Sequence, residues 1–267
     1  MDTHQVHLSA IVGERGNAHS TAFGGLCYYE PKMTRQDTSW DEVLKASARL
    51  QQLVPDAVLV GGSAAALHAG HRVSYDDDHV INDLRDRFGS VLEALEASRG
   101  WVTARVTQPV LILGSLEGVE TGIRQLIRKL PLEIEERSVE GMSLRVPTLE
   151  ETARIKGWLI LKRNATRDFL DFVALADKLG ADESCGVILS MDHYYEDQIG
   201  PGGQRISLQL IKQLGEPKPY DLSKVDLAHY RGLAKRWQNW NTIVGFCREL
   251  AANAMKVPEV DDEGVSL

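Results

Sequence analysis

The alternation of hydrophobic and polar positions becomes regular at Ser39, a residue type that can cap a helix. The hydrophobic residues that follow recur at helical spacing: Val43, Leu44, Ala46, Leu50 and Leu53. Before this point the chain mixes Gly, His, Thr and Ser and shows no sustained period. We therefore expect residues 1–38 to be a weakly structured arm or an extension that lies across the main body.

The segment between this helix and residue 147 alternates short apolar runs with helical patterns. The run 57–60 has the pattern of a buried strand, and a glycine turn separates it from a helix-forming stretch, 64–69. The further expected elements are a strand near 78–81, a helix over 84–98, and strands at 101–107, 109–113 and 119–126. Residues 39–147 should accordingly form an α/β core, a mixed sheet with flanking helices.

Helical patterns dominate the second half of the chain. Thr148 is expected to cap the first of these helices, with Glu151 three residues on to complete a capping box. From residue 182 to 257 nearly every signal is helical, apart from turns rich in Gly and Pro. The expected domains are thus the arm 1–38, the core 39–147, a helical domain 148–257 and an acidic tail 258–267.

Composition narrows the class of protein. With 43% hydrophobic residues the chain can bury one substantial core, or a medium core with a smaller helical lobe. No apolar run approaches the ~20 residues that cross a bilayer, and the polar start lacks signal-peptide features, so we expect a cytoplasmic protein without a membrane partner. Three widely spaced cysteines suggest neither disulfides nor a zinc site. A net charge of −8 argues against a surface that coats nucleic acid but is compatible with a local basic groove.

The candidate chemistry begins at Gly61-Gly62-Ser63, between the buried strand and the short helix. Glycines let the backbone approach a ligand closely, and a helix N-terminus presents unpaired N–H groups. Ser63 adds a hydroxyl donor. The turn is therefore a candidate seat for phosphate.

Two carboxylates follow at Asp76 and Asp78. Residues two apart on an extended stretch point the same way, so these side chains would repel unless a divalent cation lay between them. Mg²⁺ prefers carboxylate oxygens together with nucleotide phosphates. A phosphate seat beside a metal seat indicates nucleotidyl or phosphoryl transfer. The alternative is a connecting turn and a solvated acidic loop.

Two blocks of sequence resemble a known family. The stretch 58–78, VLVGGSAAALHAGHRVSYDDD, is similar to the first motif of the AbiEii/AbiGii-type nucleotidyltransferase toxins, whose relatives include the MenT toxins. The stretch from Arg154-Ile155-Lys156 to Arg167-Asp168-Phe169-Leu170-Asp171 is similar to the family's second block. The resemblance covers about residues 40 to 180. It implies a polymerase-β-like fold, Mg²⁺ or Mn²⁺, an NTP substrate, an RNA acceptor such as the 3′ end of tRNA, and a cognate antitoxin protein.

The resemblance also implies roles for single residues. Asp76 and Asp78 would bind metal, Lys156 would neutralise triphosphate charge, and Asp168 would orient Lys156 or act as a base. The residues expected to contact the nucleotide are Gly61, Gly62, Ser63, Arg72 and Lys156. Asp171 is interpreted as structural, paired with Arg167. The alternative for the basic residues on these helices is an ordinary solvated face with ion pairs.

One position departs from the family pattern. A third carboxylate is expected on a neighbouring strand, but Gly122 stands there. Glu120 lies on the same strand face and is our candidate replacement. If Glu120 does not replace the missing acid, the protein would be a nucleotide- or partner-binding module of the same fold. Transfer to a small molecule is a third alternative. Aromatic residues of the helical half, Tyr230 among them, are more typical of a helical core than of RNA stacking.

Overall fold

The computed structural model describes residues 38–257. Nearly all of the expected arm, the acidic tail and Cys27 lie outside these residues. Cys185 and Cys247 are buried and form no disulfide. No helix among residues 38–257 is long and apolar enough to cross a membrane.

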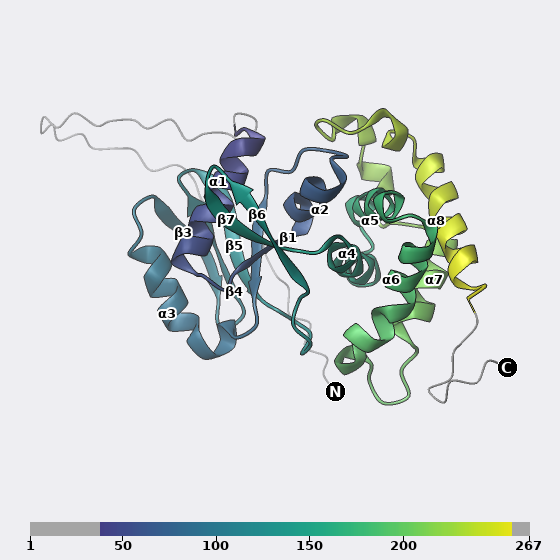
Figure 1. The fold of residues 1–267 in the computed structure, drawn as a ribbon, viewed down its shortest axis with the longest axis horizontal. Coiled ribbons are helices and arrows are strands. Elements are labelled where there is room, and N and C mark those ends of the chain that lie inside the picture. Colours follow the sequence, from purple (N-terminus) through teal and green to yellow (C-terminus); the bar gives the residue numbers. More distant parts are fainter. Residues whose placement is uncertain (1–37, 258–267) are drawn as a thin grey trace, which may run out of the picture. The chain divides into compact units, whose positions relative to one another are not determined.

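A five-stranded sheet with helices beside it makes up the first half of the described chain (Figure 1). The strand order is β1-β2-β5-β4-β3, in which β2 and β5 are parallel and the other neighbours antiparallel. The expected mixed α/β sheet is therefore confirmed. Its elements are α1 (Trp40–Leu53), β1 (Val58–Val60), α2 (Gly61–Ala69), β2 (Asp77–Ile81), α3 (Leu84–Glu96), β3 (Trp101–Thr107), β4 (Leu111–Leu116) and β5 (Val119–Gln125).

Helices α1 and α3 pack against one face of this sheet. Leu50 of α1 and Phe88 of α3 share a hydrophobic cluster with Ile81, Ile112 and Ile123 of the strands. Ser39 caps α1 and forms a complete capping box with Glu42. Because α1 and α3 cover this face, only the other face of the sheet is available to a site.

Strand β2 shows how the sheet sorts its polar residues. Asp77, His79 and Ile81 are buried on the side of α1 and α3, whereas Asp78 and Val80 point to the other side. The Ser47 hydroxyl donates to Asp77 across 2.6 Å. Burial raises the pKa of Asp77 and lowers the pKa of His79. Of the Asp76–Asp78 triplet, the central carboxylate thus belongs to the core.

The sequence did not predict a hairpin that follows the sheet, β6 (Ile134–Val139) and β7 (Met142–Pro147). Most residues of β6 are exposed, and its sequence is mainly polar, so it lacks the apolar pattern of a buried strand. The turn is made by Glu140 at φ 49° and Gly141 at φ 81°, a pair of left-handed residues typical of a tight hairpin. Leu144 and Val146 of β7 join Leu59 of β1 in a buried cluster, so the hairpin extends the core.

The second half is helical, as expected. Its helices are α4 (Leu149–Arg163), α5 (Thr166–Leu179), α6 (Ala181–Tyr194), α7 (Ile206–Gly215) and α8 (Trp240–Ala254). The connection from α7 to α8 was expected to be mainly helical. It holds only short 3₁₀ turns, at Leu222–Lys224, Leu227–His229 and Lys235–Trp237.

Helix α5 lies in the middle of the helical core. Phe169, Leu170 and Phe172 are buried in the main cluster of that core. Asp168 and Asp171 lie on the same helix and are fully buried as well. Because a buried carboxylate is costly unless it is paired, these two residues require cationic partners nearby.

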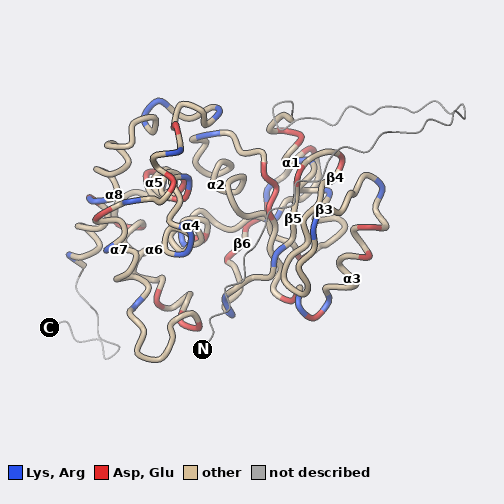
Figure 2. The backbone as a smooth tube through the Cα atoms, turned by 180° about the vertical axis from the view of Figure 1, so that it is seen from behind, with Lys and Arg blue, Asp and Glu red and all other residues tan. Residues whose placement is uncertain are grey.

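Charges are otherwise mixed along the backbone. Figure 2 shows acidic and basic positions interspersed over both the strands and the helices. No long single-sign tract runs along the described chain, in keeping with the modest net charge. Specific charge clusters, not overall charge, must therefore define a site.

Candidate functional site

A cavity of about 400 Å³ lies between the uncovered side of the sheet and helices α4 and α5. It brings together residues that are far apart in the sequence. Its polar lining residues include Gly61, Gly62, Arg72, Asp76, Asp78, Arg124, Lys156, Arg163, Arg167 and Arg231. Eight of the sequence-predicted site residues fall on the first half or on α4. Six of them line the cavity: Gly61, Gly62, Arg72, Asp76, Asp78 and Lys156. Ser63 and Glu120 do not.

The glycine turn has no room for side chains. Helix α2 begins at Gly61, immediately after β1, and no side chain caps it. A Cβ on Gly61, whose φ is 75°, would lie 3.3 Å from Asp78 Oδ2. A Cβ on Gly62 would lie 2.6 Å from Arg72 Nη2. The unpaired N–H groups of this helix end therefore lie next to one carboxylate and one guanidinium.

The strand register places Asp78 at the turn. Val60 pairs with Asp78 across the antiparallel β1–β2 ladder, so the carboxylate lies beside the start of α2. The Ser63 hydroxyl, expected to donate to phosphate, donates to the Asp76 backbone carbonyl, and Ser63 is fully buried. Ser63 therefore fixes the loop that presents Asp76, while its side chain lies outside the cavity lining.

Asp76 and Asp78 are the two acidic residues that line the cavity. Their carboxylates are the hard oxygen ligands that Mg²⁺ or Mn²⁺ takes, with phosphate oxygens and water to complete the shell, so the residues present fit such an ion. Among residues 38–257 no group of three or more His, Cys, Asp or Glu residues is placed to hold a metal ion. In the described residues, Asp76 and Asp78 are therefore not joined by a third His, Cys, Asp or Glu in such a group.

The position of the missing third acid is closed by packing. Gly122 of β5 pairs directly with Asp78 of β2. A Cβ on Gly122 would lie 2.5 Å from Leu113 Cδ2 and 3.2 Å from the Ile112 carbonyl oxygen. Glu120, the candidate replacement, is exposed and is not among the cavity-lining residues. Arg124, on the same face of β5, does line the cavity, and its Nε lies 3.6 Å from Asp78 Oδ1.

Asp171 joins the basic residues of the site. Its carboxylate accepts two hydrogen bonds from Arg72, of 2.7 and 3.0 Å, and lies 2.8 Å from His71 Nε2 and 2.6 Å from Lys156 Nζ. Burial by itself raises the pKa of Asp171, but Arg72 and Lys156 outweigh it and hold that pKa well below its usual range. The pairing with Arg167 inferred from the sequence is therefore wrong, because the partners come from the loop after α2 and from α4.

Asp168 has a different set of partners. Arg163 binds it with two hydrogen bonds, of 2.8 and 3.1 Å, and Lys156 Nζ lies 3.7 Å away. Its carboxylate is fully buried and is not among the lining residues of the cavity. The geometry suits the orienting role expected for Asp168 better than that of a base in contact with a substrate.

The connection between α7 and α8 contributes a wall that the sequence interpretation did not place at the site. Its backbone pairs with the loop after α2, through Val73 N–H to the Arg231 carbonyl (2.9 Å) and Ala234 N–H to the His71 carbonyl (2.8 Å). The Arg72 guanidinium lies 5.9 Å from the Tyr230 ring centre. The signal that could have suggested this wall is the adjacent aromatic and basic pair, Tyr230-Arg231.

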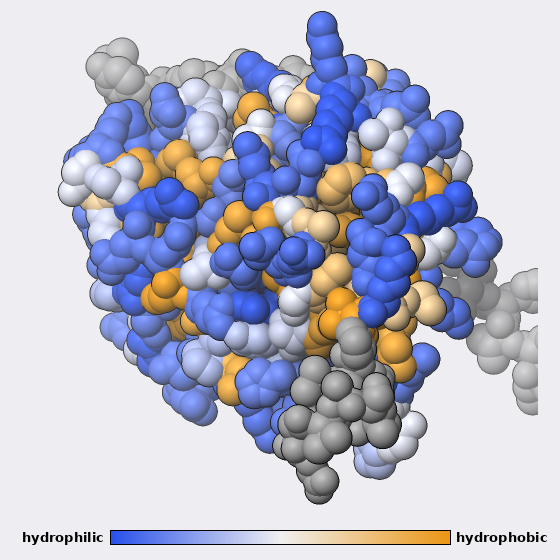
Figure 3. Space-filling view, turned by 45° about the vertical axis from the view of Figure 1, so that its right-hand side comes forward, coloured by the Kyte–Doolittle hydropathy of each residue, from blue (hydrophilic) through white to orange (hydrophobic). Residues whose placement is uncertain are grey.

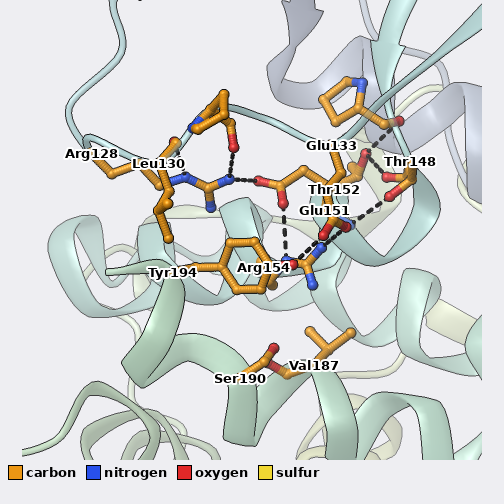
Figure 4. Close-up of polar contacts among 12 residues, drawn as sticks. Arg128, Leu130, Glu133, Thr148, Glu151, Thr152, Arg154, Val187, Ser190 and Tyr194 are labelled. Atoms are coloured by element: carbon orange, nitrogen blue, oxygen red, sulfur yellow. Dashed lines mark hydrogen bonds and ion pairs between the residues drawn. The ribbon is translucent and has the colours of Figure 1, made fainter. Parts of the chain in front are cut away.

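A second charged network holds the segment after β5 against α4 (Figure 4). The Thr148 hydroxyl accepts from the Glu151 N–H, but the Glu151 carboxylate turns inward to Arg128 (2.6 Å) and Arg154 (3.0 Å), so the expected capping box is only half formed. Arg128 also donates to the carbonyls of Leu130 and Pro131. Burial raises the pKa of Glu151, and the two guanidinium groups oppose that effect. Figure 4 shows these side chains converging on the first turn of α4.

Comparison with curated proteins finds sequence similarity to part of a longer protein. No family model matches the chain. It is 30% identical over 210 residues to the heme uptake protein MmpL11 of Mycobacterium tuberculosis (strain ATCC 25618 / H37Rv), a match that covers 67% of this chain and 20% of MmpL11. The chain thus spans about a fifth of the length of this relative.

Solved structures with distant similarity to the chain include a candidate nucleotidyltransferase and an antibiotic-resistance factor. A candidate nucleotidyltransferase from H. pylori is 16% identical, with a TM-score of 0.46 over 84% of this chain and 95% of that protein. The antibiotic-resistance factor ANT(2″)-Ia, in complex with adenylyl-2″-tobramycin, is 12% identical, with a TM-score of 0.44 over 60% of this chain and 99% of that protein. Both similarities are distant, and we base the proposed function on the geometry of the cavity.

Proposed function

We propose that the protein is a metal-dependent nucleotidyltransferase that takes its nucleotide from an NTP. One observation carries the proposal: Gly61 and Gly62 at the N-terminus of α2, Asp76 and Asp78, and Lys156 line the same cavity. The close packing of Asp78 against Gly61 supports a shared ligand, because a phosphate on the helix end would lie within reach of a cation on the carboxylate.

Each group has a role in such a reaction. Asp76 and Asp78 would hold Mg²⁺ or Mn²⁺, which when bound neutralises phosphate charge and polarises the P–O bonds. Gly61 and Gly62 let the backbone N–H groups approach the triphosphate, and Arg72 and Lys156 offset its negative charge. An acceptor hydroxyl would attack the α-phosphate in line. The new P–O bond would form as the bond to pyrophosphate breaks.

The proton of the attacking hydroxyl needs an acceptor. We propose Glu120 for this role, because extending the β2–β5 register by one residue places it opposite Asp76. Asp168 is proposed as a positioning residue, since it lies 3.7 Å from Lys156 and makes two hydrogen bonds with Arg163.

The acceptor is proposed to be an RNA, such as the 3′ end of a tRNA, in a toxin–antitoxin system with a cognate antitoxin in the cytoplasm. Support comes from the resemblance of the two sequence blocks and from the basic residues at the cavity. Arg167 is exposed and makes no ion pair with the described part of the chain, so it is available to a phosphate of the acceptor.

A second candidate is favoured by the packing at Gly122. Because Leu113 fills the place where a third acid would stand, the protein could bind nucleotide without transferring it. In that case the cavity would serve as a nucleotide- or partner-binding module, and Glu120 would have no role in chemistry.

Transfer can be tested with each α-³²P-labelled NTP, Mg²⁺ or Mn²⁺, and total RNA. We expect one labelled RNA product with the wild type, its loss in Asp76→Asn and Asp78→Asn, and no change in Asp182→Asn, an exposed acid of α6 outside this cavity. Calorimetry with the same NTPs separates the candidates. Binding without product in any acceptor mixture, including aminoglycoside-type small molecules, favours the module, and labelling that persists in both aspartate variants refutes the proposed site.

A further inference from the structure

The cavity has an apolar part in addition to the part lined by Gly61, Gly62, Asp76 and Asp78. Strand β5 ends at this part, and one face of α4 runs along it. Apolar surface as such is common on this protein: Figure 3 shows several separate hydrophobic patches among hydrophilic side chains. The apolar part consists of residues that line the same cavity as Gly61 and Asp78, and this location distinguishes them from the other hydrophobic patches. They are Leu126, Ile127, Ile155, Trp158, Leu159 and Tyr195.

Within this set, Trp158 has neighbours over its aromatic ring. Its ring is stacked on Tyr195, with centroids 4.5 Å apart and an interplanar angle of 12°. Lys162 Nζ lies 4.3 Å from the ring centre, which places it over the face that Tyr195 leaves open. Since both faces are covered, only the ring edge can meet the cavity. The indole Nε1–H is buried and has no acceptor in the described protein. Because buried donors are nearly always satisfied, we take this N–H as the candidate donor to an acceptor atom of a ligand.

Ile127 also lines the apolar part, from the segment that follows β5. It is 55% exposed although it is a large aliphatic residue. Its segment cannot easily withdraw into the core, because Arg128 next to it is tied to Glu151 of α4 and to the carbonyls of Leu130 and Pro131 (Figure 4). The charged network thus holds an apolar side chain out at the cavity in place of burying it.

We propose that this apolar part binds the base of the nucleotide, against Ile127 and the edge of Trp158, with the Trp158 indole N–H donating to an acceptor atom of the base. The inference rests on the proposed function, since it extends the same site. A nucleotide whose phosphates lie on α2 must place its base elsewhere in the same cavity, and this part offers apolar contact from two segments, residues 126–127 and α4.

The competing position for the base is the wall from the α7–α8 connection. There the aromatic rings already have guanidinium partners: Arg72 lies 5.9 Å from the Tyr230 ring and Arg231 lies 5.6 Å from the Tyr75 ring. These two guanidinium groups line the cavity and can donate to phosphate oxygens, whereas the cations beside Trp158 and Tyr195, Lys162 and Arg128, are not among its lining residues. The aromatic edge of Trp158 and the aliphatic Ile127 are the better match for a base.

The test compares two probes on the full-length protein: each of the four NTPs, and inorganic tripolyphosphate, all with Mg²⁺. The variants are Ile127→Gln and Trp158→Phe, the second of which keeps an aromatic ring but lacks the N–H. Ile134→Gln is the matched control, because Ile134 is 43% exposed on β6 and does not line the cavity. We expect each cavity variant to weaken NTP binding about tenfold and to leave tripolyphosphate binding within about twofold.

Trp158→Phe should in addition reduce the differences in Kd among the four NTPs, because it removes a directed donor. Equal weakening of tripolyphosphate and NTPs, or unchanged NTP binding in both cavity variants, would overturn the base subsite. So would Tyr230→Ala weakening NTP binding while Ile127→Gln does not. Failure of the proposed function gives different results: the wild type would bind neither probe if the cavity is no nucleotide site, and would bind NTP without forming a labelled product if the protein is a binding module.

Discussion

Removing the charge of Asp171 is expected to destabilise the protein more than any surface change. Asp171→Asn removes the carboxylate that pairs with Arg72 and leaves Lys156 with Asp168, 3.7 Å away, which it shares with Arg163. The side chains of Arg72 and Lys156 are only 9% and 2% exposed, so water cannot take over the role of the lost charge. Breaking a buried ion pair in this way costs about 3–5 kcal/mol.

Urea unfolding followed by circular dichroism measures this effect at neutral pH. The control is Asp177→Asn, whose carboxylate is 31% exposed and pairs with Arg236 at the surface. This variant should cost about 1 kcal/mol or less.

The pH dependence of stability gives a second test. Because the folded-state pKa of Asp171 is well below its usual range, its contribution is present at neutral pH and is lost as the pH falls below about 4 through that lowered pKa. The difference between wild type and variant should therefore shrink in acid. A loss below about 1 kcal/mol at neutral pH would refute our account of the cluster.

Three further predictions concern close packing and burial. Gly62→Ala places a methyl group 2.6 Å from Arg72 Nη2, so we expect tripolyphosphate binding to weaken at least about tenfold in calorimetry. Gly122→Asp introduces a side chain 2.5 Å from Leu113 Cδ2, and thermal unfolding should show a loss of about 1–3 kcal/mol with no gain in nucleotidyl transfer. Cys247 is fully buried and its thiol pKa is raised to about 12, so mass spectrometry after iodoacetamide at pH 8 should find it unmodified in the folded protein and alkylated in urea.

Local elements could be predicted because their signals lie within a few residues of one another. The Ser39 cap, the glycine turn at the start of α2 and the β-branched strands each follow from backbone preference and period. The hairpin β6–β7 was missed because β6 carries polar residues on an exposed edge, and its place is decided by packing of β7 on β1. The 3₁₀ turns between α7 and α8 were missed because their backbone is fixed by pairing with a distant loop.

For the site, the sequence by itself supplied the residue types and one short-range arrangement, a glycine turn followed by two carboxylates that could act together with it. The antiparallel pairing that sets Asp78 opposite Val60 comes from the structure. Only the tertiary structure decided which charges meet. Asp171 lies 15 residues after Lys156 on a different helix and 99 residues after Arg72, and the ion pairs among them depend on how α5 packs beside α4 and the loop after α2. Helical and strand periods determine where a side chain points on its own element. They contain no information about which element packs opposite, and that packing forms the cavity.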